Sequence, residues 1–226
     1  IDVGHSPLVG RVGLADSMSS LDKSINEDLA IIQGVGYPGQ NRSHFKSIAI
    51  WETGGDGQNS KTAGWLTNSL EKLYSNDQIV AHGASLEGSL GLFARGSGVY
   101  ISMARLNQLY GINASNSQRS MNALMKKIIK NKADLSFASK QISEKLSYFP
   151  ASKLPARMPY GNFSAQLTDA LRIIGSETAI PVMHVQHGSF DTHDGQKWQH
   201  PKLLSELTEG LASFRKNLIN MGRWDD

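Results

Sequence analysis

The chain has 226 residues, of which 39% are hydrophobic and 19% are charged, values typical of a soluble globular protein with a sizeable core. Its formal net charge of +3 is too small to favour nucleic acid as a partner, and no apolar run is long enough to span a membrane. The absence of cysteine excludes disulfides, thiolate metal sites and cysteine nucleophiles.

The first quarter of the chain predicts a helix from Leu14, then a short strand, then a second helix. The strand, Leu29–Gln33, runs into a loop rich in Gly and Pro. The second helix is expected to have Asn41 or Ser43 as its N-cap and to stop at Gly54. Its apolar residues recur at helical spacing: Phe45, Ile48 and Trp51.

The middle of the chain predicts another helix over Gly64–Tyr74 and a strand over 78–83 (QIVAHG). Residues 84–155 are interpreted as an insertion, in which Arg95–Gly98 (RGSG) separates short β-rich pieces and indicates a hairpin. A helical pattern follows from Ser117 to Leu146. Its apolar stripe is interpreted as core and comprises Met121, Leu124, Met125, Ile128 and Ile129.

The last third predicts a helix, a strand and a long helix. The first helix ends at Gly175, and the almost continuous apolar run Ile180–Gln186 is typical of a central parallel strand buried on both faces. An amphipathic helix is expected from His200 to Gly222. This order of elements predicts the α/β class, with helices on both faces of an open sheet.

Polar residues with metal-binding chemistry gather directly after that strand, in HGSFDTHDGQKWQH. Loops follow the carboxyl ends of the strands in an open α/β sheet, where ligands bind. Carboxylate and imidazole together suit zinc, and also manganese or iron. The candidate metal ligands are therefore Asp191, His193 and His200, and the alternative is a polar loop that binds nothing.

A second candidate site lies at the start of the helix behind Ser43. A helix N-terminus offers free N–H groups to an anion, and the Arg42 guanidinium suits phosphate or sulfate oxygens. Ser43 is a candidate nucleophile, and the candidate roles of His44 are metal ligand, base and nucleophile. The alternative is an N-cap serine with an incidental histidine beside it. We expect both strand-end loops to lie at the same edge of the sheet.

Two stretches, IIQGVGYPGQNRSHFKSIAIWETG and GSFDTHDGQKWQHPKLLSELTEGLASFRKNL, resemble the bacterial family called domain of unknown function 1501. That family belongs to the alkaline phosphatase and sulfatase superfamily, and the resemblance extends from about Leu29 to Trp224. It implies a three-layer α/β/α sandwich with a mostly parallel central sheet and a small hairpin and helical insertion. It also implies a divalent metal cofactor, with zinc first and manganese or calcium as alternatives.

The resemblance assigns roles to the candidate residues. Asp191, His193 and His200 match the family's metal motif, and counting back from Thr53 places His44 in the nucleophile position. Ser43 takes that position if the count shifts by one residue, and both alternatives stay open. The implied function is hydrolysis of phosphate or sulfate esters of small molecules or glycans. The alternative is a non-catalytic protein that keeps the fold and binds an anion or glycan.

The chain is expected to form a single domain over 1–226. Compared with the family pattern, it lacks the first strand and the C-terminal part, so a complementing segment or a homo-oligomer is expected to complete it. The chain opens at Ile1 without a signal peptide, which indicates a processed or trimmed product. The resemblance implies a periplasmic or secreted location.

Overall fold

The computed structural model describes residues 2–6, 10–21, 28–40, 42–55, 62–103 and 132–225, in which helices and strands are mixed. Residue contacts divide the chain into two compact units. The sheet unit comprises Tyr37–Lys153 and Arg172–Val185. The α8 unit, named after its longest helix, α8 (Gln196–Asn220), comprises Ile1–Gly36, Leu154–Leu171 and Gln186–Asp226. Within the described ranges, no helix is long and apolar enough to cross a membrane.

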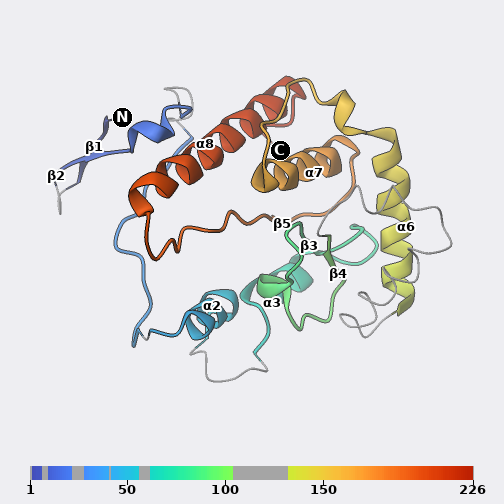
Figure 1. Cartoon of the computed structure of the whole chain (residues 1–226). Helices are drawn as coiled ribbons and strands as arrows, with labels where there is room; N and C mark the ends of the chain where they lie inside the picture. The colour runs from blue at the N-terminus through green and yellow to red at the C-terminus, as the bar shows by residue number, and fades with distance from the viewer. Residues whose placement is uncertain are drawn as a thin grey trace. The chain divides into compact units, whose positions relative to one another are not determined.

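The α8 unit is organised along its long helix (Figure 1). Gly210 lets the neighbouring helix approach closely, since a Cβ there would lie 3.1 Å from the ring of Phe163. The buried Asn217 side chain on α8 accepts a hydrogen bond from the Ala156 backbone N–H at 2.9 Å. This bond holds the chain at Ala156 against α8. The other elements with residues in this unit are β1 (Asp2–Ser6) and β2 (Gly10–Gly13), which pair antiparallel, η1 (Asp16–Met18) and α7 (Asn162–Gly175).

The sheet unit contains a parallel sheet in the order β4-β3-β5 (Figure 1). Its strands are β3 (Gly83–Ser85), β4 (Tyr100–Ser102) and β5 (Met183–His184). Phe93 stacks on Tyr100 with ring centroids 5.5 Å apart, and both belong to a core cluster with Leu70. The other elements are α2 (His44–Thr53), α3 (Trp65–Leu73), η2 (Gly91–Phe93), α6 (Lys132–Tyr148) and η3 (Ala151–Lys153).

The helix predictions with clear end signals are confirmed. Ser43 is the N-cap of α2, where its Oγ accepts a hydrogen bond from Lys46 N at 3.3 Å, and Gly54 is the left-handed C-cap with a φ of 66°. Helices α3, α7 and α8 also form where they are predicted. Of the predicted helix 117–146, the part from Lys132 onward is α6, whereas Asn41 and the apolar stripe at 121–129 lie outside the described residues.

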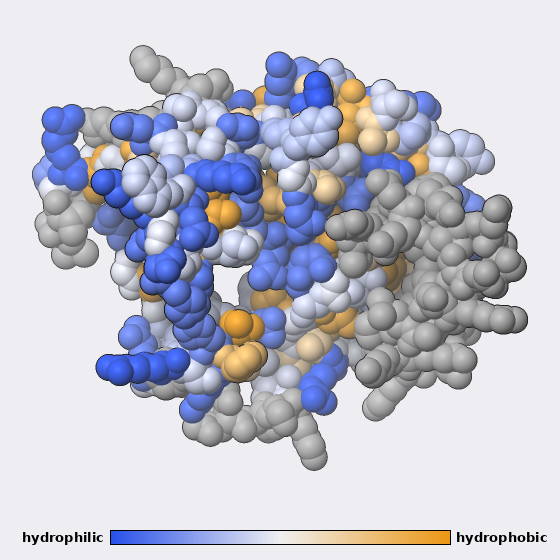
Figure 2. Space-filling model, in the orientation of Figure 1, coloured by the Kyte–Doolittle hydropathy of each residue, from blue (hydrophilic) through white to orange (hydrophobic). Residues whose placement is uncertain are grey.

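Helix α2 has the predicted position but buries none of its residues. Phe45 is 87% exposed, and the space-filling view shows apolar surface where α2 lies (Figure 2). Tyr37 provides a local contact, since its ring meets Trp51 edge-on and its hydroxyl lies 2.6 Å from Ser47 Oγ. Helical spacing therefore located this helix correctly, but did not place its apolar residues in a core.

The strand predictions are less accurate. Leu29–Gln33 has no regular structure. The run Ile180–Gln186 contributes only the two residues of β5, which are half-buried and form an edge of the described sheet, so the prediction of a central strand buried on both faces is wrong here. Strand β3 begins at Gly83, where the predicted strand 78–83 ends. Strand pairing depends on distant neighbours, which apolar runs do not reveal.

The hairpin prediction at Arg95–Gly98 is wrong, because β4 follows this segment and pairs parallel with β3. The two glycines of this segment are needed because other side chains lie close to their backbone, and not because they form a hairpin turn. A Cβ on Gly96 would lie 2.3 Å from the ring of Tyr100, and one on Gly98 would lie 2.7 Å from His82 Nδ1.

Glu71 on α3 holds the segment that leads into β4. Its carboxylate accepts hydrogen bonds from Gly98 N at 2.9 Å, from the Tyr100 hydroxyl at 3.1 Å and from the Ser97 hydroxyl. Burial acts to raise the pKa of Glu71, but these hydrogen bonds outweigh it and hold the pKa below its usual value. The ionised carboxylate is therefore the form that stabilises the folded sheet.

We expect Glu71→Gln to lower the free energy of unfolding by about 1 kcal/mol at neutral pH, because a neutral amide accepts these hydrogen bonds more weakly. A lowered folded-state pKa stabilises the protein above the unfolded-state value and loses that contribution as the pH falls through the folded-state pKa. The difference between parent and variant should therefore shrink in acid. Urea unfolding from pH 7 to pH 3 measures it. Glu206→Gln, in an exposed pair with Lys202, is the control, and an equal pH dependence for both variants would contradict this account.

Candidate functional site

The loop that follows β5 is anchored where it leaves the strand. The Gln166 side chain on α7 accepts a hydrogen bond from Gln186 N at 2.8 Å and donates one to Gln186 O at 2.9 Å. A buried glutamine that pairs with both backbone groups of one residue fixes the direction of the chain there. The histidines of the following loop therefore start from a defined position.

His187 and His200 are both held by backbone carbonyls. His187 Nε2 lies 2.9 Å from Leu203 O, and His200 Nε2 lies 2.9 Å from Phe190 O. A carbonyl oxygen only accepts hydrogen bonds, so Nε2 carries the proton in both rings. Phe190 meets both imidazoles edge-on, with centroids 5.2 Å from His187 and 5.8 Å from His200. These two side chains thus help to pack the loop.

The hydrogen bond to Phe190 O determines which ring nitrogen of His200 can bind a metal. Protonation at Nε2 leaves the lone pair at Nδ1, as in metal-binding histidines that donate their other N–H to a backbone carbonyl. Gln196 Nε2 lies 3.3 Å from this atom and can donate to it. A metal at Nδ1 would therefore have to displace the Gln196 amide.

Asp191 and His193 are brought together by the structure. Asp191 Oδ2 lies 3.2 Å from His193 Nε2, with 57% and 84% of the two side chains exposed. His193 has a φ of 51°, in the left-handed region that residues other than glycine seldom adopt. Backbone strain of this kind is often found at functional sites. The pair therefore presents an oxygen and an imidazole to solvent from a constrained loop.

The three predicted ligands do not form one group as their side chains stand. Among the residues that the structure describes, no three His, Asp or Glu side chains are arranged to hold a metal ion. The donor types nevertheless suit zinc, because Asp191 and His193 are adjacent and His200 has its lone pair on Nδ1. A shared metal would require His200 to leave Gln196, and the loop to adjust.

The second candidate site is the first turn of α2. Arg42, Ser43 and His44 are all exposed there, and α2 is 10 residues long, so its amino end carries the usual positive dipole. Ser43 Oγ already acts as the cap for Lys46 N. The structure therefore supports the N-cap interpretation of Ser43, while His44 lies one residue further, on the first helical turn.

The two sets of candidate residues belong to different units. Asp191, His193 and His200 lie in the α8 unit, and the first turn of α2 lies in the sheet unit. A common site for both sets remains a prediction from the order of the elements.

A further polar cluster at the carboxyl ends of β3 and β5 was not predicted from the sequence. Ser85 and His184 are register partners, and the buried atoms Ser85 Oγ and His184 Nδ1 have no hydrogen-bond partner among the residues that the structure describes. Burial raises the pKa of Glu52 at the end of α2, while His184 acts to lower it and Glu87 to raise it further. The unpaired Nδ1 distinguishes His184 from a core histidine whose ring nitrogens are satisfied. Only the strand pairing, which is non-local, brings these residues together.

Comparison with known protein families matches residues 25–226 to a family described as Protein of unknown function (DUF1501). The matched range includes every candidate residue of both sites. No curated protein and no solved structure matches the chain.

Proposed function

Because the chain belongs to the DUF1501 family, we propose that it is a metal-dependent hydrolase of phosphate or sulfate esters. The proposal includes the three-layer α/β/α fold of the alkaline phosphatases and sulfatases. The observation that carries it is the contact of Asp191 Oδ2 with His193 Nε2 at 3.2 Å, in a strained and exposed loop after a parallel strand. Such a pair offers the donor types that a zinc hydrolase requires.

Asp191, His193 and His200 are the residues that would hold the metal. Zinc held there would supply a Lewis acid to polarise the ester and stabilise negative charge on the transferred group. Phe190 O holds the His200 ring through Nε2 and fixes the tautomer in which Nδ1 carries the lone pair. Asp191 contributes a negative charge that favours a cation in this loop.

The first turn of α2 is proposed to bind the transferred group and to supply the nucleophile. Its free N–H groups and the Arg42 guanidinium would contact the phosphate or sulfate oxygens. The ring nitrogen of His44, or the Ser43 hydroxyl oxygen as the alternative, would attack the phosphorus or sulfur atom. The bond to the ester oxygen would break, and the alcohol would leave with a proton taken from water or, for Ser43, from its hydroxyl group. Water would then release the phosphate or sulfate from the protein.

The second candidate function is binding of an anion or glycan without catalysis. It is favoured by one observation, the hydrogen bond from Lys46 N to Ser43 Oγ, which employs a candidate nucleophile as a helix cap. A helix N-terminus that binds an anion needs no nucleophile. The two functions therefore differ in whether the bound ester is cleaved.

The test is to measure nitrophenol release from nitrophenyl phosphate and nitrophenyl sulfate with added zinc, manganese or calcium, beside a sample with chelator. Hydrolysis that requires the metal and shows saturation supports the enzyme. If the same esters raise the melting temperature of the protein without being cleaved, the binding function replaces it. If the esters are not hydrolysed and do not stabilise the protein with any of the three metals, both functions are contradicted.

A further inference from the structure

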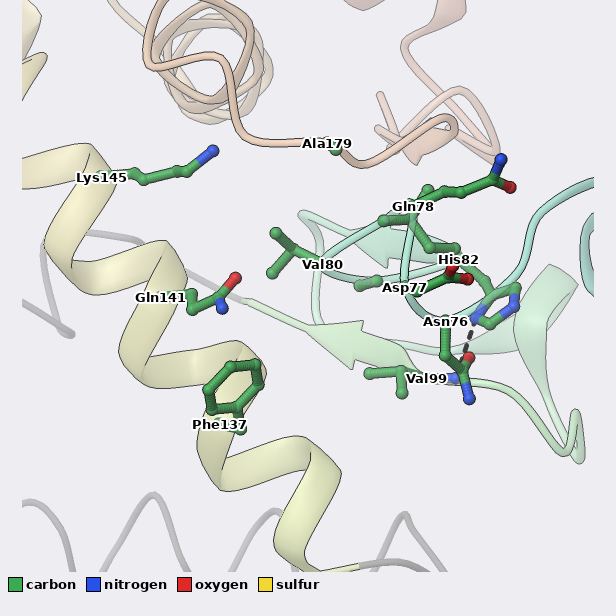
Figure 3. A pocket seen from close by; sticks show the side chains of 12 residues that line it. Asn76, Asp77, Gln78, Val80, His82, Val99, Phe137, Gln141, Lys145 and Ala179 are labelled. Atoms are coloured by element: carbon green, nitrogen blue, oxygen red, sulfur yellow. Dashed lines mark hydrogen bonds between the residues drawn. The ribbon is translucent and has the colours of Figure 1, made fainter.

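A cavity of about 550 Å³ lies at the amino ends of the parallel strands, between α6 and the segment Asn76–Ala81 (Figure 3). It is lined just before β3 by Val80 and His82, before β4 by Val99 and before β5 by Ala179. All of its described lining residues belong to the sheet unit. Its volume is in the range of pockets that hold small organic molecules. Neither candidate site contributes a residue to this cavity, so what it binds is independent of the proposed hydrolase.

One face of α6 forms a wall of this cavity. Phe137, Gln141 and Lys145 follow each other at intervals of four residues and all line the cavity. Gln141 and Lys145 extend from the helix toward the side on which Val80 lies (Figure 3). Phe137 is 64% exposed although it is a large aromatic side chain. The buried face of the same helix is supplied by other residues, namely Ala138, Ile142 and Leu146. Phe137 therefore adds apolar surface to the cavity and is not needed for the core.

Lys145 gives the cavity a fixed positive charge. Its Nζ donates a hydrogen bond to Glu177 O at 2.7 Å, which holds the long side chain in place. An ammonium group has three N–H donors, so one bond to Glu177 leaves donors for a ligand. Gln141, one turn away on the same face, adds an amide N–H₂ group. An anionic group would find both charge and hydrogen bonds at this end.

Among the described lining residues, the other charged group is Asp77. It is fully exposed, and a hydrogen bond from the Ser75 hydroxyl lowers the pKa of its carboxyl group. Charge at a fully exposed position is strongly screened by water and salt, whereas Lys145 is half-buried. The attraction to Lys145 therefore outweighs the repulsion from Asp77 for an anion that sits against α6.

We propose that this cavity binds an organic anion with an apolar body, such as an aromatic carboxylate or sulfonate. The anionic group contacts Lys145 and Gln141, and the apolar body covers Phe137, Val80 and Val99. Phe137 is then buried by the ligand, which explains a large aromatic side chain exposed in a hollow.

The proposal is tested with anilinonaphthalene sulfonate, an aromatic anion whose fluorescence increases in apolar surroundings. Lys145→Gln should weaken its binding about tenfold, since a charged hydrogen bond is lost, and Lys145→Arg should retain it. Lys140→Gln is the matched control, because Lys140 is exposed and paired with Glu144 on the same helix. The neutral analogue phenylnaphthylamine should bind parent and Lys145→Gln equally, and bind Phe137→Ala more weakly.

A dye of this kind can also bind other apolar surfaces, so Phe45→Ser on α2 is included. Retention of the fluorescence in Phe45→Ser and its loss in Lys145→Gln and Phe137→Ala support the cavity as the site. Loss of the signal in Phe45→Ser would overturn the proposal. Equal affinity of parent and Lys145→Gln for the sulfonate, or equal weakening by Lys140→Gln, would also overturn it. Circular dichroism confirms that each variant is folded.

Discussion

His44→Ala is expected to lower metal-dependent hydrolysis of nitrophenyl phosphate and sulfate by about a thousandfold or more, because removal of the proposed nucleophile would leave only binding and electrostatic stabilisation. His44 is exposed on the first turn of α2, so alanine leaves no buried cavity and should not unfold the helix. The loss should therefore appear in kcat, with a small change in KM. Initial rates at saturating zinc measure both constants.

Ser43 requires a variant that separates catalysis from capping. Ser43→Ala removes both the hydroxyl and the cap of Lys46 N and should cost about 1 kcal/mol of stability. Ser43→Asn removes the hydroxyl but keeps a good N-cap. If His44 is the nucleophile, Ser43→Asn should retain most of the turnover. A loss of turnover in Ser43→Asn at unchanged stability, with His44→Ala still active, would assign the nucleophile to Ser43 instead.

His193→Ala and Asp191→Asn are each expected to weaken zinc binding by about a hundredfold or more. His193→Ala removes one donor and Asp191→Asn removes the negative charge of another, and changes around metal sites that leave all ligands in place already cost about tenfold to a hundredfold. Both side chains are largely exposed, so the fold should tolerate the changes. Calorimetric titration of zinc into parent and variants measures the affinity. Asp194→Asn is the control, since it alters a carboxylate of the same loop outside the proposed ligand set.

Unchanged zinc affinity in both ligand variants would support the interpretation of this segment as a polar loop. The same result with a large effect of Asp194→Asn would place the metal elsewhere in the loop. Because metal binding requires deprotonated ligands, the titrations are compared at one pH.

The helices could be predicted because their signals are local. Ser43 and Gly54 mark the ends of α2, and the amphipathic patterns of α7 and α8 identify those helices from sequence alone. The exposed Phe45 was not foreseeable, since helical spacing shows where apolar residues lie on a helix but not what covers them. Local sequence thus predicted where helices form better than it predicted which of their residues are buried.

The strands and the polar cluster at their ends could not be predicted in the same way. The glycines of Arg95–Gly98 indicated a turn, but they are required by the approach of Tyr100 and His82, which depends on the tertiary fold. His184 meets Ser85 only through the pairing of β5 with β3. The His-rich loop was identified from its composition. Composition did not reveal that His200 contacts Phe190 O while His193 contacts Asp191. The residue types therefore indicated a metal-binding chemistry, but they did not predict which contacts each residue makes in the fold.

The most direct test of the proposed metal-dependent hydrolysis is the zinc concentration that gives half-maximal hydrolysis of nitrophenyl phosphate, compared between parent and His193→Ala. We expect no turnover in chelator, saturation with zinc in the parent, and a shift to about a hundredfold higher zinc in the variant. Turnover that persists in chelator, or the same half-maximal zinc concentration in both proteins, would contradict it.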